Sequence, residues 1–357
     1  MNKLNSILAV ALLAIIFTAC KKDNNPVIVV PPSDGSTLTL NGLIATESGS
    51  NAGNSVYVDF SKEKQVSVDR SSWDLGFYAG ADFKVILNST KGASAVKIEK
   101  TDLNAVTEAD LVPENLEVVL GNTDEAEFKK VDDPREANIL NKTAIAIVSS
   151  VDADNKVYLI SIVGGSHGTS INVDNVYKIR VIRKAQGYTL QYAKLKETSF
   201  KTLDVTKDAL LNFNFISLTQ GKTVTVEPEK AEWDMVWTWS LYYGLAGSSS
   251  YVYGYSDVVF INNISNVTAA QVSTTTKSYA DFAEADLAGI TFSSARDVIG
   301  SKWRNTTGSA VGVIPTVFYV VKDGSGNIYK LKFNSFISND GGERGRPVIE
   351  YKLVKKG

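Results

Sequence analysis

The chain has 357 residues, a formal net charge of −2, one histidine and one cysteine. It contains no long basic stretch that would suit a phosphate backbone, so we expect no binding to nucleic acid. The single cysteine excludes an internal disulfide and a cysteine-based metal site. Frequent aromatic, valine and isoleucine residues favour strands over helices.

The start of the chain has the pattern of a secretory signal peptide. Lys3 precedes an apolar run that ends at Phe17, and the small residues Thr18 and Ala19 come before Cys20. The run is about half the roughly 20 residues that a membrane-spanning helix needs. Phe-Thr-Ala-Cys resembles the lipobox of bacterial lipoproteins, so we predict that residues 1–19 are removed and that Cys20 carries a lipid anchor. An ordinary signal peptide that ends near a chance cysteine is the alternative.

The segment after Cys20 is polar and contains Pro, Gly and Ser, apart from the apolar residues 27–30. This composition is typical of a flexible linker. We therefore predict a tether at residues 20–36 that holds the folded part away from the membrane.

The rest of the chain contains a repeat. The offset of 160 residues that separates Trp73 from Trp233 also separates Val157 from Val317, and the residues around each pair are similar. A constant offset over such a length indicates duplication of a domain of ordinary size. We predict two domains, at residues 37–200 and 205–357.

Both predicted domains have the pattern of antiparallel sheets. Apolar and polar residues alternate, as in residues 178–181 and 330–333, which is typical of half-buried strands. Residues 323–327, Asp-Gly-Ser-Gly-Asn, have the composition of a hairpin turn. Helical patterns are confined to residues 107–111 and 279–287. We predict an all-β protein of two tandem antiparallel β-sheet domains with few short helices.

The pairs Trp73-Asp74 and Trp233-Asp234 are expected to have structural roles. A tryptophan on a strand usually fills a core, and the aspartate after it points to the opposite face, where it usually holds a loop.

His167 is the one side chain with an obvious chemical role, because a loop imidazole is a natural ligand for a metal or haem. A merely solvated histidine is the alternative. No nucleophile elbow accompanies His167, so a Ser-His-Asp triad is not expected, and zinc would need more ligands than the chain offers. The acids in residues 152–155 fit a turn better than a calcium loop. We predict no catalytic residue, no resident metal site and no enzyme.

An aromatic segment is the most unusual feature of the second predicted domain. Strand alternation would place Trp237 and Trp239 on one face, near Tyr242 and Tyr243 and followed by the tyrosines of residues 251–255. Such a face could bind a flat or sugar-like ligand or another protein. A contact between the two domains is the alternative.

Residues 73–89, residues 221–226 with 232–235, and residues 317–333 resemble the HmuY family of Gram-negative bacteria. The resemblance implies an all-β envelope lipoprotein, and the best known members are haemophores that pass haem to an outer-membrane receptor. In those members two histidines or two methionines on loops in the later half of the domain hold the iron.

The equivalent stretch here, residues 299–308, contains neither histidine nor methionine. After removal of the signal peptide the chain retains only His167 and Met235 as such donors, one in each predicted domain. Because axial ligation needs a donor on each side of the iron, two-histidine binding is excluded, while binding through one histidine or a tyrosine stays open.

The sequence therefore predicts a non-enzymatic, lipid-anchored HmuY-like binding protein that acts in haem or nutrient acquisition. Its expected place is the outer membrane, either surface-exposed or facing the periplasm, and its expected partners are the membrane and haem, a glycan or an outer-membrane receptor. The alternative is a structural or adhesive surface module that binds a glycan or a partner protein through its aromatic face.

Overall fold

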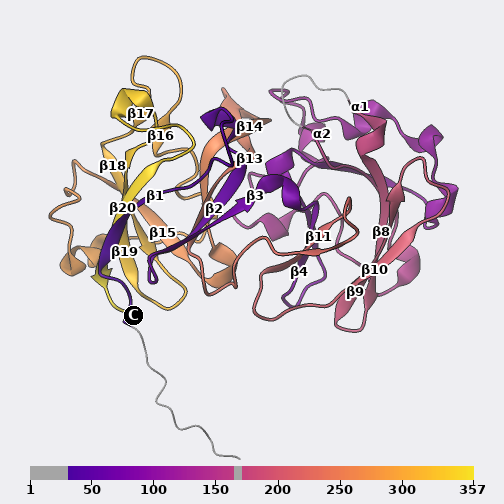
Figure 1. Ribbon diagram of the computed structural model, residues 1–357, viewed down its shortest axis with the longest axis horizontal. Helices are drawn as coiled ribbons and strands as arrows, with labels where there is room; N and C mark the ends of the chain where they lie inside the picture. Colours follow the sequence, from indigo (N-terminus) through magenta and orange to yellow (C-terminus); the bar gives the residue numbers. More distant parts are fainter. Residues whose placement is uncertain (1–30, 165–170) are drawn as a thin grey trace, which may run out of the picture. The chain divides into compact units, whose positions relative to one another are not determined.

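Antiparallel sheets make up almost all of the regular structure in the computed structural model, which describes residues 31–164 and 171–357 (Figure 1). Residues Pro32–Gly357 form one compact unit. The prediction of an all-β fold is confirmed. The two expected helical segments contain only short 3₁₀ turns, Glu108–Asp110 and Glu284–Gly289, and the α-helices α1 (Pro113–Leu116) and α2 (Glu125–Phe128) are one turn each.

Nine strands form a first sandwich, with sheet orders β12-β11-β4-β5 and β10-β9-β8-β7-β6. The strands are β4 (Leu75–Tyr78), β5 (Val85–Leu87), β6 (Ser94–Ile98), β7 (Val157–Ser161), β8 (Val176–Lys184), β9 (Gly187–Lys194), β10 (Lys201–Val205), β11 (Phe213–Ser217) and β12 (Lys222–Val224). One apolar cluster lies between the two sheets and includes Phe77, Ile179 and Tyr188.

Nine further strands form a second sandwich, with sheet orders β14-β13-β2-β3 and β1-β20-β19-β18-β15. The strands are β1 (Gly35–Thr39), β2 (Asn54–Asp59), β3 (Lys64–Asp69), β13 (Met235–Ala246), β14 (Ser249–Ile261), β15 (Thr268–Ser273), β18 (Val317–Lys322), β19 (Ile328–Ser335) and β20 (Val348–Lys355). Its core includes Val58, Trp237 and Tyr329. A small ribbon of β16 (Arg304–Asn305) and β17 (Gly312–Val313) lies outside these sheets.

The two sandwiches exchange their early strands. The strands β1, β2 and β3 precede residue 73, yet they belong to the second sandwich. There β1 pairs with β20 and β2 pairs with β13, where Val58 lies opposite Met235. Conversely, β10 and β11 pair with β9 and β4, where Phe213 lies opposite Tyr78. Figure 1 shows the indigo strands β2 and β3 beside the orange strands β13 and β14. The boundaries at 37–200 and 205–357 stay a prediction about the sequence repeat, and hydrogen bonds between strands cross them in both directions.

The two Trp-Asp pairs hold the exchanged strands in place. The Asp74 carboxylate accepts a hydrogen bond from the N–H of Leu218, just after β11, at 2.8 Å. The Asp234 carboxylate accepts one from the N–H of Phe60, just after β2, also at 2.8 Å. Each aspartate therefore satisfies a buried backbone donor on a strand from the other part of the chain, which is a structural role of the expected kind.

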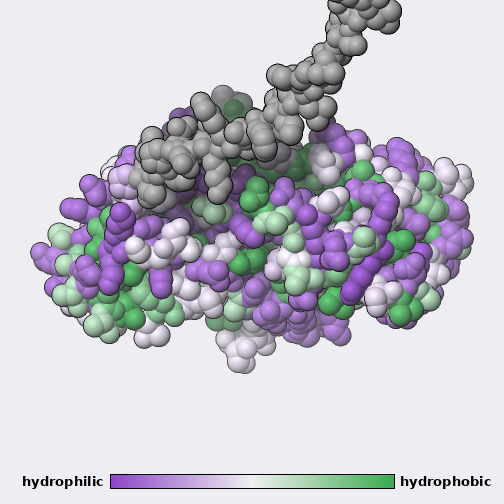
Figure 2. Space-filling view, turned by 90° about the horizontal axis from the view of Figure 1, so that it is seen from below, coloured by the Kyte–Doolittle hydropathy of each residue, from purple (hydrophilic) through white to green (hydrophobic). Residues whose placement is uncertain are grey.

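Hydrophilic and hydrophobic side chains are mixed over the face shown in Figure 2. Large exposed apolar side chains such as Ile147, Leu210 and Leu245 belong to separate segments, and single residues of this kind are normal on a folded protein. Across residues 31–164 and 171–357, no helix is long and apolar enough to span a bilayer.

Candidate functional site

Trp237 and Trp239 lie in different environments. The Trp237 side chain is 1% exposed in the core of the second sandwich. Trp239 is half-buried, and the Arg70 guanidinium lies 5.6 Å from the centre of its ring. The pairing of β13 with β14 shifts register between Thr238 and Ser240. The extra residue of this shift lies on β14 rather than on β13. The two indoles nevertheless pack in different clusters, Trp237 in the core of the second sandwich and Trp239 beside Leu241 and Val252.

Tyr242 and Tyr243 are in ring contact, with centroids 4.7 Å apart. Tyr242 is buried, and its hydroxyl donates a hydrogen bond to the Asp297 carboxylate at 2.5 Å. Tyr243 is half-buried. Trp239 and Tyr243 are thus the partly accessible members of the predicted ligand-binding set, and ligand binding by this set stays a prediction.

The neighbouring strand β14 carries a tyrosine ladder, formed by Tyr251, Tyr253 and Tyr255. The rings meet edge to face, with centroids 6.1 and 5.8 Å apart along the strand, and each is half-buried. Gly244 lies opposite Tyr251, where a Cβ would come within 2.3 Å of the Tyr251 ring. Glycine at this position therefore lets the Tyr251 ring lie across β13. Tyrosine rings of this kind suit contacts with a sugar, a flat ligand or a protein surface.

A cavity of about 130 Å³, here called the inner seam cavity, lies where the two sandwiches meet. Its wall is largely apolar and draws on both sandwiches, with the aromatic residues Tyr57, Trp73, Phe213, Phe215 and Trp233 among its lining residues. Three ionisable side chains, Asp132, Glu227 and Arg296, also reach this wall. They come from distant segments without a shared local motif, so the sequence analysis did not identify them.

Burial controls the ionisation of the two acids. The Asp132 carboxylate accepts the N–H of Leu87 at 2.7 Å and that of Ala144 at 3.0 Å, and burial raises its pKa to about 7. The Glu227 carboxylate accepts the N–H of Asn212 at 3.0 Å and that of Phe213 at 2.8 Å. Burial raises the pKa of Glu227 to about 8. Both groups can therefore hold a proton near neutral pH.

Arg296 is the cation of the inner seam cavity. Its guanidinium lies 3.9 Å from the centre of the Phe260 ring, a cation–π distance. Burial lowers the pKa of Arg296 to about 10, so the side chain still carries its charge at neutral pH. The inner seam cavity thus combines aromatic walls with proton-holding carboxyls and one cation, an arrangement that can bind a small polar group.

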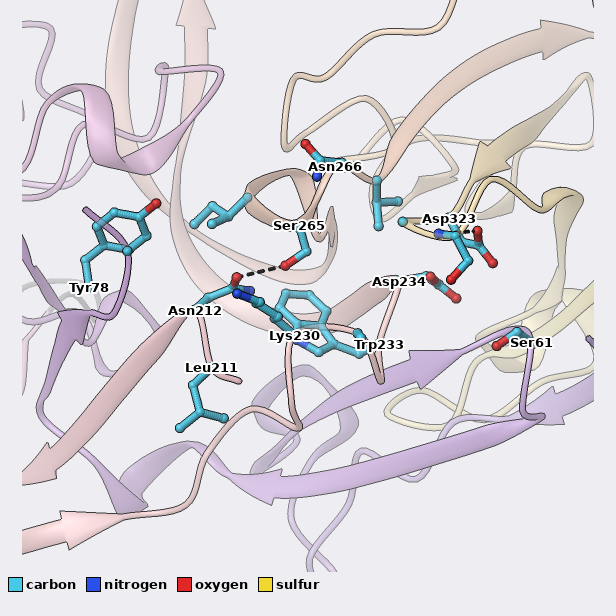
Figure 3. Close-up of a pocket in the computed structure, with 16 residues that line it drawn as sticks. Ser61, Tyr78, Leu211, Asn212, Lys230, Trp233, Asp234, Ser265, Asn266 and Asp323 are labelled. Carbon is cyan, nitrogen blue, oxygen red and sulfur yellow. Dashed lines mark hydrogen bonds between the residues drawn. The ribbon is translucent and has the colours of Figure 1, made fainter. Parts of the chain in front are cut away.

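An adjoining cavity of about 260 Å³, the outer seam cavity, shares Asn212 and Trp233 with the inner one (Figure 3). Two hydrogen bonds fix the Asn212 side chain. Its NH₂ group donates to Oδ1 of Asn262 at 2.9 Å, and its Oδ1 accepts from the Ser265 hydroxyl at 2.8 Å. Asp234 lies on the opposite side of the cavity from Asn212 in Figure 3. The outer seam cavity therefore has a polar wall at each side.

The expected haem and lipid residues are only partly open to structural description. Cys20 and His167 lie outside the described residues. Met235 is fully buried in the core of the second sandwich, so its sulfur cannot meet a ligand from solvent. In the stretch 299–308, Trp303 is buried and stacks on Phe333 with centroids 4.1 Å apart. The described part of the chain therefore does not fit haem held by two histidines or two methionines.

Metal coordination by clustered side chains is likewise not supported within the ranges 31–164 and 171–357, which contain no group of three histidine, cysteine or acidic side chains placed to hold an ion.

Comparison with known proteins gives a match to the family model described as HmuY protein, over residues 51–351. No curated protein and no solved structure matches the chain. The family match includes strands of both sandwiches.

Proposed function

The chain belongs to the HmuY family, and on that premise we propose that it is a lipid-anchored, non-enzymatic binding protein of the cell envelope that acts in haem or other nutrient acquisition. The observation that carries the proposal is the family match over residues 51–351. Removal of residues 1–19 and lipidation of Cys20 would place the protein on the outer membrane, facing either the periplasm or the exterior, with an outer-membrane receptor as a possible recipient of its cargo.

The mode of binding must differ from paired axial ligation. Met235 is buried, and His167 is the only histidine of the sequence. When bound, haem would supply an iron centre and a flat apolar ring. The chain would then contribute one ligand at most from histidine, or a tyrosine, together with aromatic contacts.

A haem titration of the protein without residues 1–20, followed in the Soret region, tests this proposal. We expect a saturable shift of the Soret band for the wild type. Loss of the shift in His167→Ala would assign that histidine as the ligand, whereas an unchanged shift would direct the search to tyrosines. A titration without any saturable change in the wild type would refute haem binding.

The tyrosine ladder favours a second function, adhesion to a glycan or a partner protein. Three half-buried rings in a row on β14 offer an aromatic surface that does not require iron. A glycan array probed with the wild type and with a Tyr251→Ala/Tyr255→Ala variant tests this alternative. Binding that is lost in the variant and kept in Leu245→Ala, an exposed residue on β13, would support adhesion. A wild type that binds no glycan on the array would argue against a glycan ligand.

A further inference from the structure

Two loops, one beside each sandwich, share a hydrogen bond from an asparagine side chain to the backbone carbonyl of the tryptophan in the Trp-Asp pair. The Asn88 amide donates to the carbonyl oxygen of Trp73 at 2.8 Å, and the Asn262 amide donates to that of Trp233 at 3.0 Å. A 3₁₀ turn follows each asparagine, at Ser89–Lys91 and at Asn263–Ser265. The two loops are therefore equivalent in structure, although Asn88 follows Trp73 by 15 residues and Asn262 follows Trp233 by 29.

Lys91 and Ser265 occupy the same place in these loops. The N–H of Lys91 donates to the carbonyl oxygen of Asn88 at 3.1 Å, and the N–H of Ser265 donates to that of Asn262 at 3.0 Å. Each is followed by a left-handed residue, Gly92 with φ of 71° and Asn266 with φ of 66°. The lysine of the first loop is therefore matched by a serine in the second loop.

In the first loop the lysine neutralises the buried aspartate of the Trp-Asp pair. The Lys91 ammonium lies 2.6 Å from Oδ1 of Asp74, while Oδ2 of Asp74 accepts the N–H of Leu218. Both oxygens of this 2% exposed carboxylate are therefore occupied. Pairing of this kind offsets the cost of burying a charge.

In the second loop the equivalent aspartate has no such partner. Oδ2 of Asp234 accepts the N–H of Phe60, but within residues 31–164 and 171–357 no side chain forms an ion pair with Asp234 and no donor bonds to Oδ1. The Ser265 hydroxyl donates instead to Asn212. Lys230 lines the same cavity and is exposed, without pairing with Asp234. Asp234 is only 6% exposed and is one of the residues that line the outer seam cavity.

The charged groups that act on Asp234 are acids, whereas the exposed Lys230 forms no ion pair with it. Asp323 lines the outer seam cavity, and Asp59 lies close enough to act on Asp234. Oδ2 of Asp59 is itself buried without a hydrogen-bond partner. Burial, reinforced by these two acids, holds the pKa of Asp234 well above its ordinary value. A cation beside Asp234 would oppose these effects and favour the ionised carboxylate.

The space for such a cation is present. The outer seam cavity has a volume of about 260 Å³ and is lined by Asp234, Asp323, Ser61 and Ser265 together with the ring of Trp233. Figure 3 shows Asp234, Asp323 and Ser61 on one side of the cavity. This volume is just below the usual range for ligand sites, about 300–1,000 Å³, and therefore suits a small molecule.

We propose that the outer seam cavity binds the primary ammonium group of a small organic cation, which takes the place at Asp234 that the Lys91 side chain takes at Asp74. The ammonium donates to Oδ1 of Asp234, and its short aliphatic chain lies toward Trp233. This site is independent of haem and of the tyrosine ladder, so its test does not depend on the function proposed above.

The direct test is calorimetric titration of the protein without residues 1–20 with n-butylammonium chloride. n-Butanol has the same shape without the charge, and tetramethylammonium has the charge without N–H donors. We expect saturable binding of n-butylammonium that is at least tenfold tighter than that of either control. Equal affinity for n-butanol, or no binding of n-butylammonium, would overturn the proposal.

Two reciprocal variants locate the site. Ser265→Lys rebuilds the pair seen in the first loop, so we expect it to raise the melting temperature and to weaken n-butylammonium binding at least tenfold. Lys91→Ser creates the same vacancy beside Asp74, so we expect a lower melting temperature that n-butylammonium partly restores. Unchanged binding by Ser265→Lys would contradict the assignment even if Lys91→Ser fails to fold.

Discussion

Replacing Glu227 by glutamine is expected to change how stability depends on pH. The Glu227 side chain is 5% exposed, and burial raises its pKa from the ordinary value of 4.5 to about 8. Between these pH values the folded protein holds a proton that the unfolded chain has lost. The free energy of unfolding of the wild type therefore falls as the pH rises from 4.5 to 8. Glu227→Gln has no proton to lose at this position and should lack that fall.

The magnitude follows from the displacement of the pKa. One pKa unit corresponds to about 1.4 kcal/mol, so the change from 4.5 to about 8 sets an upper limit of about 5 kcal/mol. Relaxation of the cavity wall reduces the effect, and we expect on the order of a few kcal/mol. The glutamine carbonyl can still accept the N–H groups of Asn212 and Phe213, which Glu227 accepts at 3.0 and 2.8 Å.

Urea unfolding at pH 5 and pH 9 measures this effect. The free energy of unfolding of Glu227→Gln, relative to that of the wild type, should be larger at pH 9 than at pH 5. Glu229→Gln, at an exposed position nearby, should show no such change. The raised pKa of Asp132 affects the wild type and the variants alike, so it cancels in the comparison. An equal loss of stability in the wild type and Glu227→Gln would refute the reasoning.

Three further outcomes are expected. Trp303→Ala should lower the free energy of unfolding by about 3–5 kcal/mol in urea titration, because Trp303 is 1% exposed. Leu245→Ala, at a 66% exposed position, should change it by less than about 0.5 kcal/mol. Equal effects of the two substitutions would contradict the packing of Trp303 described above. Cys20→Ser should abolish labelling by radioactive palmitate and move the protein out of the membrane fraction, and persistent labelling would rule out Cys20 as the lipidated residue. A fragment of residues 70–227, which contains every strand of the first sandwich, should unfold cooperatively in urea, and a featureless transition would show that the exchanged strands do not complete an independent core.

Local sequence patterns were sufficient to predict some of the strands. Residues 178–181 and 330–333 lie in β8 and β19, and Asp323 and Asn327 close the turn between β18 and β19 through a backbone hydrogen bond of 2.9 Å. Strand exchange could not be predicted in this way. The early strands of the two predicted copies have similar alternation, and alternation does not specify which partner strand a given face will meet.

The candidate sites were less predictable for two physical reasons. Trp237 and Trp239 were expected to form one accessible face, but Trp237 is buried in the core of the second sandwich, and alternation along β13 does not reveal which part of a face is covered. Asp132 and Glu227 reach one cavity only after the sandwiches assemble, and nothing in their local sequence marks that convergence. The unpaired state of Asp234 becomes visible only when its loop is compared with the equivalent loop of the first sandwich.

The absorption and paramagnetic resonance spectra of the ferric haem complex, measured on the protein without residues 1–20, test the central claim most directly. We expect a stoichiometric complex whose spectrum is not that of low-spin iron with two histidine or two methionine ligands, because Met235 is buried and His167 is the only histidine. A spectrum of paired axial ligation, or the absence of any complex, would contradict it.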